Sequence, residues 1–174
     1  FGQAVEPLVL KISGKITGPK GERVLLASHK TLVGIGADAA ILGPELHLID
    51  VENIIIRNLT LGDSREDVST DDKGPDHDAI QIDASHHIWI DHCHLRRAND
   101  GLIDLRKGSD CITVSWCILS DHNKAFGVGW TDDTAFRVTI HHTWFSRTNQ
   151  RNPGFDNGRG HLYNNFFESI TACG

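Results

Sequence analysis

The chain has 174 residues, enough for one sizeable domain, and its hydrophobic content of 39% and charged content of 23% are typical of globular rather than disordered proteins. Its net charge of −6 argues against nucleic acid as a partner. No apolar run approaches the ~20 residues of a membrane-spanning helix, so we expect no membrane partner. The residues after Phe1 show no basic region ahead of an apolar stretch, so we expect no signal peptide within the given sequence.

Residues 5–60 alternate apolar and polar side chains as β-strands do, and Gly and Pro separate the segments. Apolar residues at helical spacing over two turns are absent, so we expect an all-β protein. The strands expected in this part of the chain are residues 8–12, 24–26, 31–34, 40–42 and 46–48.

A repeat follows. Each unit has three residues of strand pattern, then polar or small residues, then an apolar close. The units are residues 54–61, 88–95, 112–119 and 138–145, and a second strand series lies between them at 80–82, 102–105 and 126–129. The last three units start 24 and 26 residues apart, and a fixed period in the twenties indicates stacked supersecondary units. We therefore expect a right-handed, single-stranded parallel β-helix forming one domain over residues 1–174. We also expect the natural protein to continue, so that this chain is a core without part of its N- and C-terminal caps.

Aligning the repeats places side chains in vertical levels. One level is apolar throughout and should point inward: Leu61, Leu95, Leu119 and Phe145. Another level is polar or aromatic and should lie at a turn: Asn58, His92, Trp116 and His142, continued by Asn164 or Asn165. Polar side chains stacked at a turn can bond the backbone of neighbouring coils, so we favour a structural over a catalytic role for them.

The four cysteines, Cys93, Cys111, Cys117 and Cys173, match no zinc-binding spacing. Cys93 and Cys117 occupy the same place in consecutive repeats and should be neighbours one coil apart. Either a disulfide or two buried thiols would fit there, and the sequence does not choose between them.

Three aspartates stand at the second strand series. Asp78 precedes one strand, while Asp100 and Asp104 lie four residues apart one coil later. In a flat strand those two would lie about 13 Å apart, too far to share an ion, so Gly101 must bend the chain or one Asp must act through water. Three converging carboxylates would make an oxygen-only site suited to Ca²⁺. The acidic stretch 61–78, which has a net charge of −5, is either a solvated loop or part of a site for a hard cation.

Two basic residues continue this face. Lys124 stands 24 residues after Asp100, and Arg151 stands 27 residues after Lys124, so each lies about one coil further on. Such a row can hold an acidic polymer although the whole chain is acidic.

These motifs resemble, in order over nearly the whole chain, the pectate lyases of polysaccharide lyase family 1. The segments that carry the resemblance are 30–36 (KTLVGIG), 53–59 (NIIIRNL), 78–80 (DAI), 87–93 (HIWIDHC), 100–104 (DGLID), 114–117 (VSWC), 121–124 (DHNK), 139–142 (TIHH), 150–153 (QRNP) and 161–165 (HLYNN).

The resemblance implies a secreted, extracellular parallel β-helix enzyme that cleaves polygalacturonate by β-elimination with Ca²⁺, and we expect it to act as a monomer. It implies that Asp78, Asp100 and Asp104 are the calcium ligands, that Lys124 binds a substrate carboxylate, and that Arg151 binds substrate and removes the C5 proton. Because a free guanidinium stays protonated at any ordinary pH, the implied role of Arg151 predicts a high pH optimum.

One position departs from the family pattern. The family often has Arg-x-Pro-x-x-Arg, whereas the last position here is Asp156. Arg147 or Arg159 would have to replace the missing arginine, and neither is in register. There are three alternatives. A pectin lyase acting on methylated polymer is disfavoured because the three aspartates are present, and a polygalacturonase using Asp71 and Asp72 is disfavoured because the Gly-His-Gly and Arg-Ile-Lys motifs of those enzymes are missing. The third is a non-catalytic, allergen-like β-helix that binds cell walls.

Overall fold

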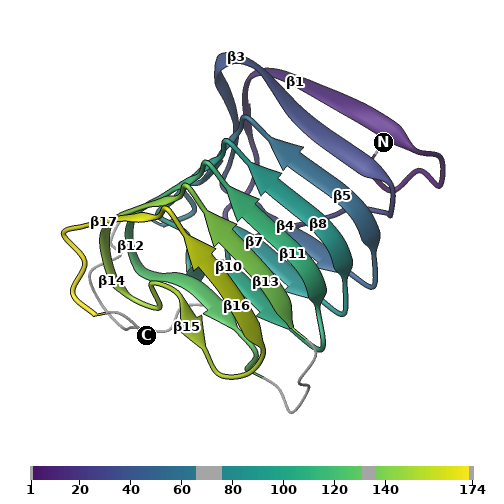
Figure 1. Cartoon of the computed structure of the whole chain (residues 1–174). Helices are drawn as coiled ribbons and strands as arrows, with labels where there is room; N and C mark the ends of the chain where they lie inside the picture. Colours follow the sequence, from purple (N-terminus) through teal and green to yellow (C-terminus); the bar gives the residue numbers. More distant parts are fainter. Residues whose placement is uncertain (1, 66–75, 131–135, 173–174) are drawn as a thin grey trace.

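The computed structural model describes residues 2–65, 76–130 and 136–172. Within these residues every helix or strand is a β-strand, and the strands stack in parallel as a β-helix (Figure 1). The all-β parallel β-helix expected from the sequence is therefore confirmed. None of the described residues forms a helix with the length and apolar content that a membrane span requires.

Three sheets run the length of the stack. The first sheet consists of β1 (Leu8–Thr17), β3 (Lys30–Leu42), β5 (Glu52–Arg57), β8 (His86–Asp91), β11 (Asp110–Ser115), β13 (Arg137–His141) and β16 (Arg159–Tyr163). The second joins the end of β3 to β6 (Thr60–Gly62), β9 (His94–Arg96), β12 (Ile118–Val128), β14 (Trp144–Gln150) and β17 (Phe166–Glu168). The third consists of β2 (Arg23–Leu25), β4 (Glu45–Ile49), β7 (Ile80–Asp83), β10 (Gly101–Arg106), the end of β12 and β15 (Gly154–Phe155).

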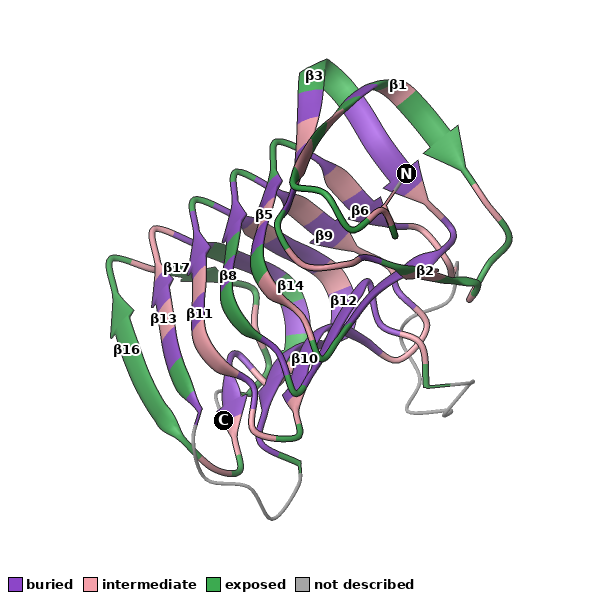
Figure 2. Cartoon of the chain, turned by 90° about the vertical axis from the view of Figure 1, so that its right-hand side faces the viewer, coloured by how far each residue is buried: buried purple, intermediate pink, exposed green. Residues whose placement is uncertain are grey.

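The core is a set of apolar levels, because in-register parallel pairing places equivalent residues of successive coils directly above one another. The predicted level Leu61, Leu95, Leu119 and Phe145 is paired in register and buried. In the third sheet the corresponding level is Leu46, Ile80, Ile103 and Phe126, all fully buried. Burying one such side chain contributes about 1.5–3 kcal/mol. Figure 2 shows buried and exposed positions alternating along the central strands of the first sheet.

The turn between the first and second sheets is made by a single residue in the left-handed conformation. Its φ lies between 51° and 55° at Asn58, His92, Trp116, His142 and Asn164, so Asn164 continues the predicted level. The Trp116 ring stacks on His142 at 4.3 Å and on His92 at 6.0 Å between centroids. The Asn58 side chain donates to the carbonyl of Gly34 in the preceding coil. The level therefore lies at the turn, as the sequence indicated, and its side chains contact neighbouring coils; their structural role stays a prediction.

Cys93 and Cys117 are neighbours one coil apart, as predicted, and both are buried, free thiols. The backbone N–H of Cys93 donates to Sγ of Cys117 at 3.4 Å. Of the two alternatives that the sequence left open, the structure has the pair of buried thiols. Cys173 lies outside the described residues.

The first coils differ from the predicted segments. Residues 31–34 and 40–42 belong to one long strand, β3, which bends from the first sheet into the second instead of ending at its glycines. Gly34 allows this bend because a Cβ there would lie 1.9 Å from the carbonyl oxygen of Asn58. A glycine that admits a neighbouring backbone was mistaken for a strand end.

Candidate functional site

Three carboxylates meet near the N-terminal ends of strands β7 and β10 of the third sheet. Asp78 lies just before β7, Asp100 just before β10, and Asp104 within β10. One oxygen from each lies within 4.8 Å of the others, so together they could hold a metal ion. The convergence expected from the sequence is therefore present, although the role of each residue stays a prediction.

Asp100 and Asp104 avoid the wide spacing of a flat strand because the chain bends at Asp100, just before Gly101 begins β10, which agrees with the bend expected from the sequence. Gly101 opens the strand and gives the site room. Its N–H donates to Oδ1 of Asp78 at 2.7 Å, and a Cβ at this position would lie 2.8 Å from the same oxygen. Only a glycine allows the Asp78 carboxylate to lie this close.

Asp78 is only 2% exposed, and its Oδ2 has no hydrogen-bond partner in the described part of the chain. Burial raises the pKa of Asp78 well above its ordinary value, and the nearby carboxylates of Asp104 and Asp100 raise it further. Burial also raises the pKa of Asp104 to about 6, although Arg151 opposes the rise. A bound cation would relieve this repulsion, and a site with only oxygen donors fits a hard cation such as Ca²⁺.

The two basic residues predicted for the site lie beside the carboxylates. Lys124, on β12, is paired in register with Gly101, and its Nζ lies 2.5 Å from Oδ1 of Asp100. Arg151 follows β14, and its Nη1 lies 3.4 Å from both carboxylate oxygens of Asp104. All five residues singled out from the sequence therefore lie on one face of the β-helix.

An open groove of about 340 Å³ crosses this face. It is lined by Asp76, Asp100, Asp104, Arg106, Lys107, Trp130 and Arg151. Asp78 and Lys124 do not line it, because both are buried. Asp78 accepts the N–H of Gly101, the first residue of β10, and Lys124 is paired with the carboxylate of Asp100, the residue before it. The groove is thus lined by both carboxylates and cationic side chains.

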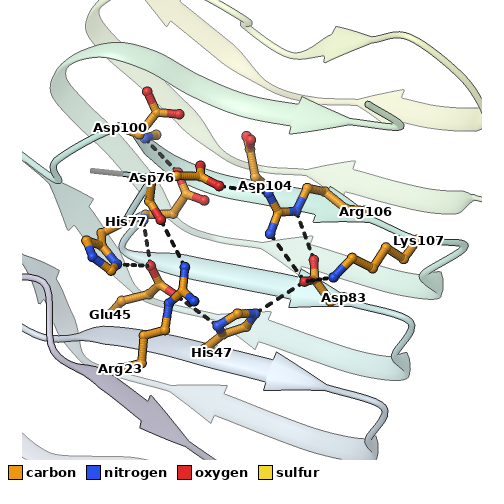
Figure 3. Close-up of polar contacts among 12 residues, drawn as sticks. Arg23, Glu45, His47, Asp76, His77, Asp83, Asp100, Asp104, Arg106 and Lys107 are labelled. Carbon is orange, nitrogen blue, oxygen red and sulfur yellow. Dashed lines mark hydrogen bonds and ion pairs between the residues drawn. The ribbon is translucent and has the colours of Figure 1, made fainter. Parts of the chain in front are cut away.

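A polar network in the earlier coils supports the Asp78 segment (Figure 3). Glu45, on β4, is almost fully buried, and its Oε2 accepts the backbone N–H of Asp78 at 3.1 Å. The same carboxylate contacts Arg23, His47 and His77. Burial raises the pKa of Glu45, while His47 and Arg23 oppose the rise. Glu45 therefore fixes the position of Asp78 through its backbone.

Arg106 and Lys107 are held at the other end of the groove by Asp83, on β7 (Figure 3). Burial tends to raise the pKa of Asp83, but hydrogen bonds from Arg106 and Lys107 outweigh it and hold the pKa at about 2. Sequence reasoning did not single out Arg106. Strand alternation would have found it, because it lies two residues after Asp104 and so on the same face of β10.

His122 positions Asp100. Its Nε2 lies 2.9 Å from the carbonyl oxygen of Asp100, so this nitrogen carries the proton and donates. Burial lowers the pKa of His122 to about 4, which keeps the ring neutral at ordinary pH. The sequence showed His122 only as part of the motif around Lys124.

Arg147 and Arg159, the two candidates to replace the arginine of the Arg-x-Pro-x-x-Arg pattern, are not among the described residues that line the groove. Arg147 forms a two-pronged ion pair with Asp121, at 2.6 and 2.9 Å. Neither Arg159 nor Asp156, both exposed, is among the described residues that line the groove. Asp71 and Asp72, with most of the acidic stretch, lie outside the described residues.

A family model described as pectate lyase matches residues 15–174. A pectate trisaccharide-lyase of Thermotoga maritima is 39% identical over 173 residues, which cover 95% of this chain and 47% of that protein.

Two solved structures are similar as well. One is a pectate lyase from Bacillus sp. N165 in complex with trigalacturonate, with a TM-score of 0.78, 27% identity, and coverage of 95% of this chain and 56% of that one. The other is jun a 1, the major allergen from cedar pollen, with a TM-score of 0.77, 26% identity, and coverage of 90% and 51%. The chain spans about half the length of the curated relatives it matches.

Proposed function

Because the chain belongs to the pectate lyase family, we propose that it carries the active site of a calcium-dependent lyase that cleaves α-1,4-polygalacturonate by β-elimination, giving 4,5-unsaturated oligogalacturonates. The observation that carries this proposal is the cluster of Asp78, Asp100 and Asp104. Their oxygens converge within 4.8 Å, and one buried oxygen of Asp78 lacks a partner in the described chain. Buried carboxylates left in this state are expected where a cation binds.

In this proposal the three aspartates hold Ca²⁺. Bound calcium would neutralise a uronate carboxylate and so stabilise the negative charge that develops when the adjacent C–H bond is broken. Lys124 binds a substrate carboxylate. Its ammonium group lies 2.5 Å from Asp100, closer to the aspartate cluster than the guanidinium of Arg151, which lies 3.4 Å from Asp104.

Arg151 removes the C5 proton of the uronate. Its guanidinium lies in the groove beside Asp104, at the edge of the carboxylate cluster. The electron pair of the C–H bond forms the C4–C5 double bond as the bond from C4 to the glycosidic oxygen breaks, and that oxygen leaves with the other fragment. No water is consumed. A neutral guanidine is needed, so activity should rise toward alkaline pH, and a flat profile between about pH 6 and 10 would contradict this role.

The polymer is too large to enter a cell, so we also propose that the protein acts outside it, as a monomer, on pectic polysaccharide. Several cationic side chains near the groove suit a polyanion, among them Arg106 and Lys107.

The test is ultraviolet absorbance of unsaturated product from polygalacturonate, with calcium and with chelator. A rise that needs calcium supports the proposal, whereas a calcium-independent rise on methylated pectin indicates a pectin lyase. New reducing ends without absorbance indicate hydrolysis, and no reaction on either polymer favours a binding protein. Arg151→Ala should abolish the signal while leaving the circular dichroism spectrum unchanged, and Arg147→Ala, which removes an arginine paired away from the groove, should not.

A further inference from the structure

The guanidinium of Arg151 has two neighbours in the groove. One is Asp104, whose two carboxylate oxygens both lie 3.4 Å from Nη1. The other is the indole ring of Trp130, whose centroid lies 4.2 Å from Cζ. The electron-rich face of an indole ring attracts a guanidinium, and tryptophan is the best side chain for this contact.

Gly127 creates the space in which these groups meet. A Cβ at this position would lie 2.4 Å from Oδ1 of Asp104 and 2.5 Å from Nε1 of Trp130. Gly127 is paired in register with both Asp104 and Gly154, so Trp130 folds back over the strands that carry the site. The ring therefore lines the groove beside Asp104 and Arg151.

The contact with Asp104 conflicts with cation binding. A calcium ligand places its oxygen about 2.4 Å from the ion, and a cation at Asp104 repels the guanidinium that now shares this carboxylate. The contact with Trp130 uses no proposed cation ligand and has no such conflict.

We propose that Trp130 is a positioning residue that keeps the guanidinium of Arg151 in the groove when Asp104 is engaged by the cation. This inference rests on the proposed function for the identity of the reaction. Without the ring, the long Arg151 side chain would sample other rotamers, and fewer molecules would present the guanidinium to the C5 proton. The effect should therefore fall on kcat rather than on cation affinity.

The experiment compares Trp130→Leu and Trp130→Phe with wild type. Leucine keeps apolar bulk without a π face, and phenylalanine keeps a weaker one. Trp144→Leu is the matched control, because Trp144 is about as exposed as Trp130 (36% against 40%) and does not line the groove. Four quantities are measured: kcat and KM on polygalacturonate, calcium affinity by calorimetry, and the rate at which phenylglyoxal modifies Arg151 in the presence of calcium, by peptide mass spectrometry.

Trp130→Leu should lower kcat by about tenfold, change KM and calcium affinity less than about twofold, and speed modification of Arg151 several-fold. Trp130→Phe should retain most of the wild-type kcat and most of the wild-type protection of Arg151 from modification. Trp144→Leu should match wild type in both. Wild-type kcat together with a wild-type modification rate in Trp130→Leu would overturn the inference. If Trp130→Leu does not fold, two results together would overturn the inference. The first is a wild-type kcat and modification rate in Trp130→Phe. The second is modification of Arg151 in wild type as fast as that of the exposed Arg159. An inactive wild type would instead refute the proposed function, and the modification rates would still test whether Trp130 holds Arg151.

Discussion

Asp104→Asn should raise the free energy of unfolding of the calcium-free protein and reduce the stabilisation that calcium provides. Burial raises the pKa of Asp104 from its ordinary value of 3.8 to about 6. The folded protein therefore binds a proton that the unfolded chain releases between these two values, and its stability falls as the pH rises through this window. The rise in pKa corresponds to about 3 kcal/mol of lost stability above pH 6.

Asparagine carries no charge at any of these pH values, so the variant escapes that penalty. It gives up the contact between Asp104 and Arg151, which is long at 3.4 Å. In chelator at pH 7 we expect Asp104→Asn to be more stable than wild type by about 1–3 kcal/mol, and its stability to change less between pH 4 and 7. Asp78, whose pKa is also raised by burial, contributes a slope of the same sign that the variant retains.

The assay is urea unfolding at several pH values, with chelator and with saturating calcium. Calcium at a hundredfold excess over Kd should stabilise wild type by about 2.7 kcal/mol and the variant much less. Asp156→Asn, which changes an exposed carboxylate away from the groove, should match wild type throughout. The reasoning is refuted if Asp104→Asn is less stable than wild type in chelator at pH 7, or if calcium stabilises both equally.

Three further predictions follow from the supporting contacts. Glu45→Ala removes the acceptor for the N–H of Asp78 and should weaken calcium binding about tenfold, as measured by calorimetry. The control Glu52→Ala changes an exposed side chain of the first sheet and should leave calcium affinity unchanged. Equal calcium affinities in the two variants would exclude the positioning role of Glu45. Trp116→Ala removes stacking on His92 and His142 and should lower the free energy of unfolding by about 1 kcal/mol without changing kcat. A loss of activity without a loss of stability would show that this turn does more than support the fold. Cys93 and Cys117 should resist thiol reagents until the protein unfolds, and a melting temperature lowered by reductant would indicate a bridge instead.

The sequence was most informative where residues recur with the coil. Pairing in register follows from the period, so the inward level at Leu95 and the turn level at Trp116 could be read directly from the alignment of repeats. The same reasoning brought Lys124 to the coil that follows Asp100. The position of each of these residues follows from its place in the repeat alone and does not depend on the conformation of a neighbouring loop.

Features that depend on how a turn bends were not available from the period. The approach of Asp100 to Asp104 depends on the turn before β10, and extended-strand geometry cannot describe it. Trp130 reaches Arg151 by folding back across Gly127, a contact between residues on different coils that share no level of the repeat. The support of Asp78 by Glu45 passes through a backbone N–H, which leaves no signature in the residue type at position 78.

The most direct measurement is the anomalous X-ray difference map of crystals grown with calcium. The account predicts a calcium peak about 2.4 Å from carboxylate oxygens of Asp78, Asp100 and Asp104, with Arg151 still stacked on Trp130. A map with no peak among these three aspartates at saturating calcium, or with the ion bound elsewhere on the chain, would contradict it.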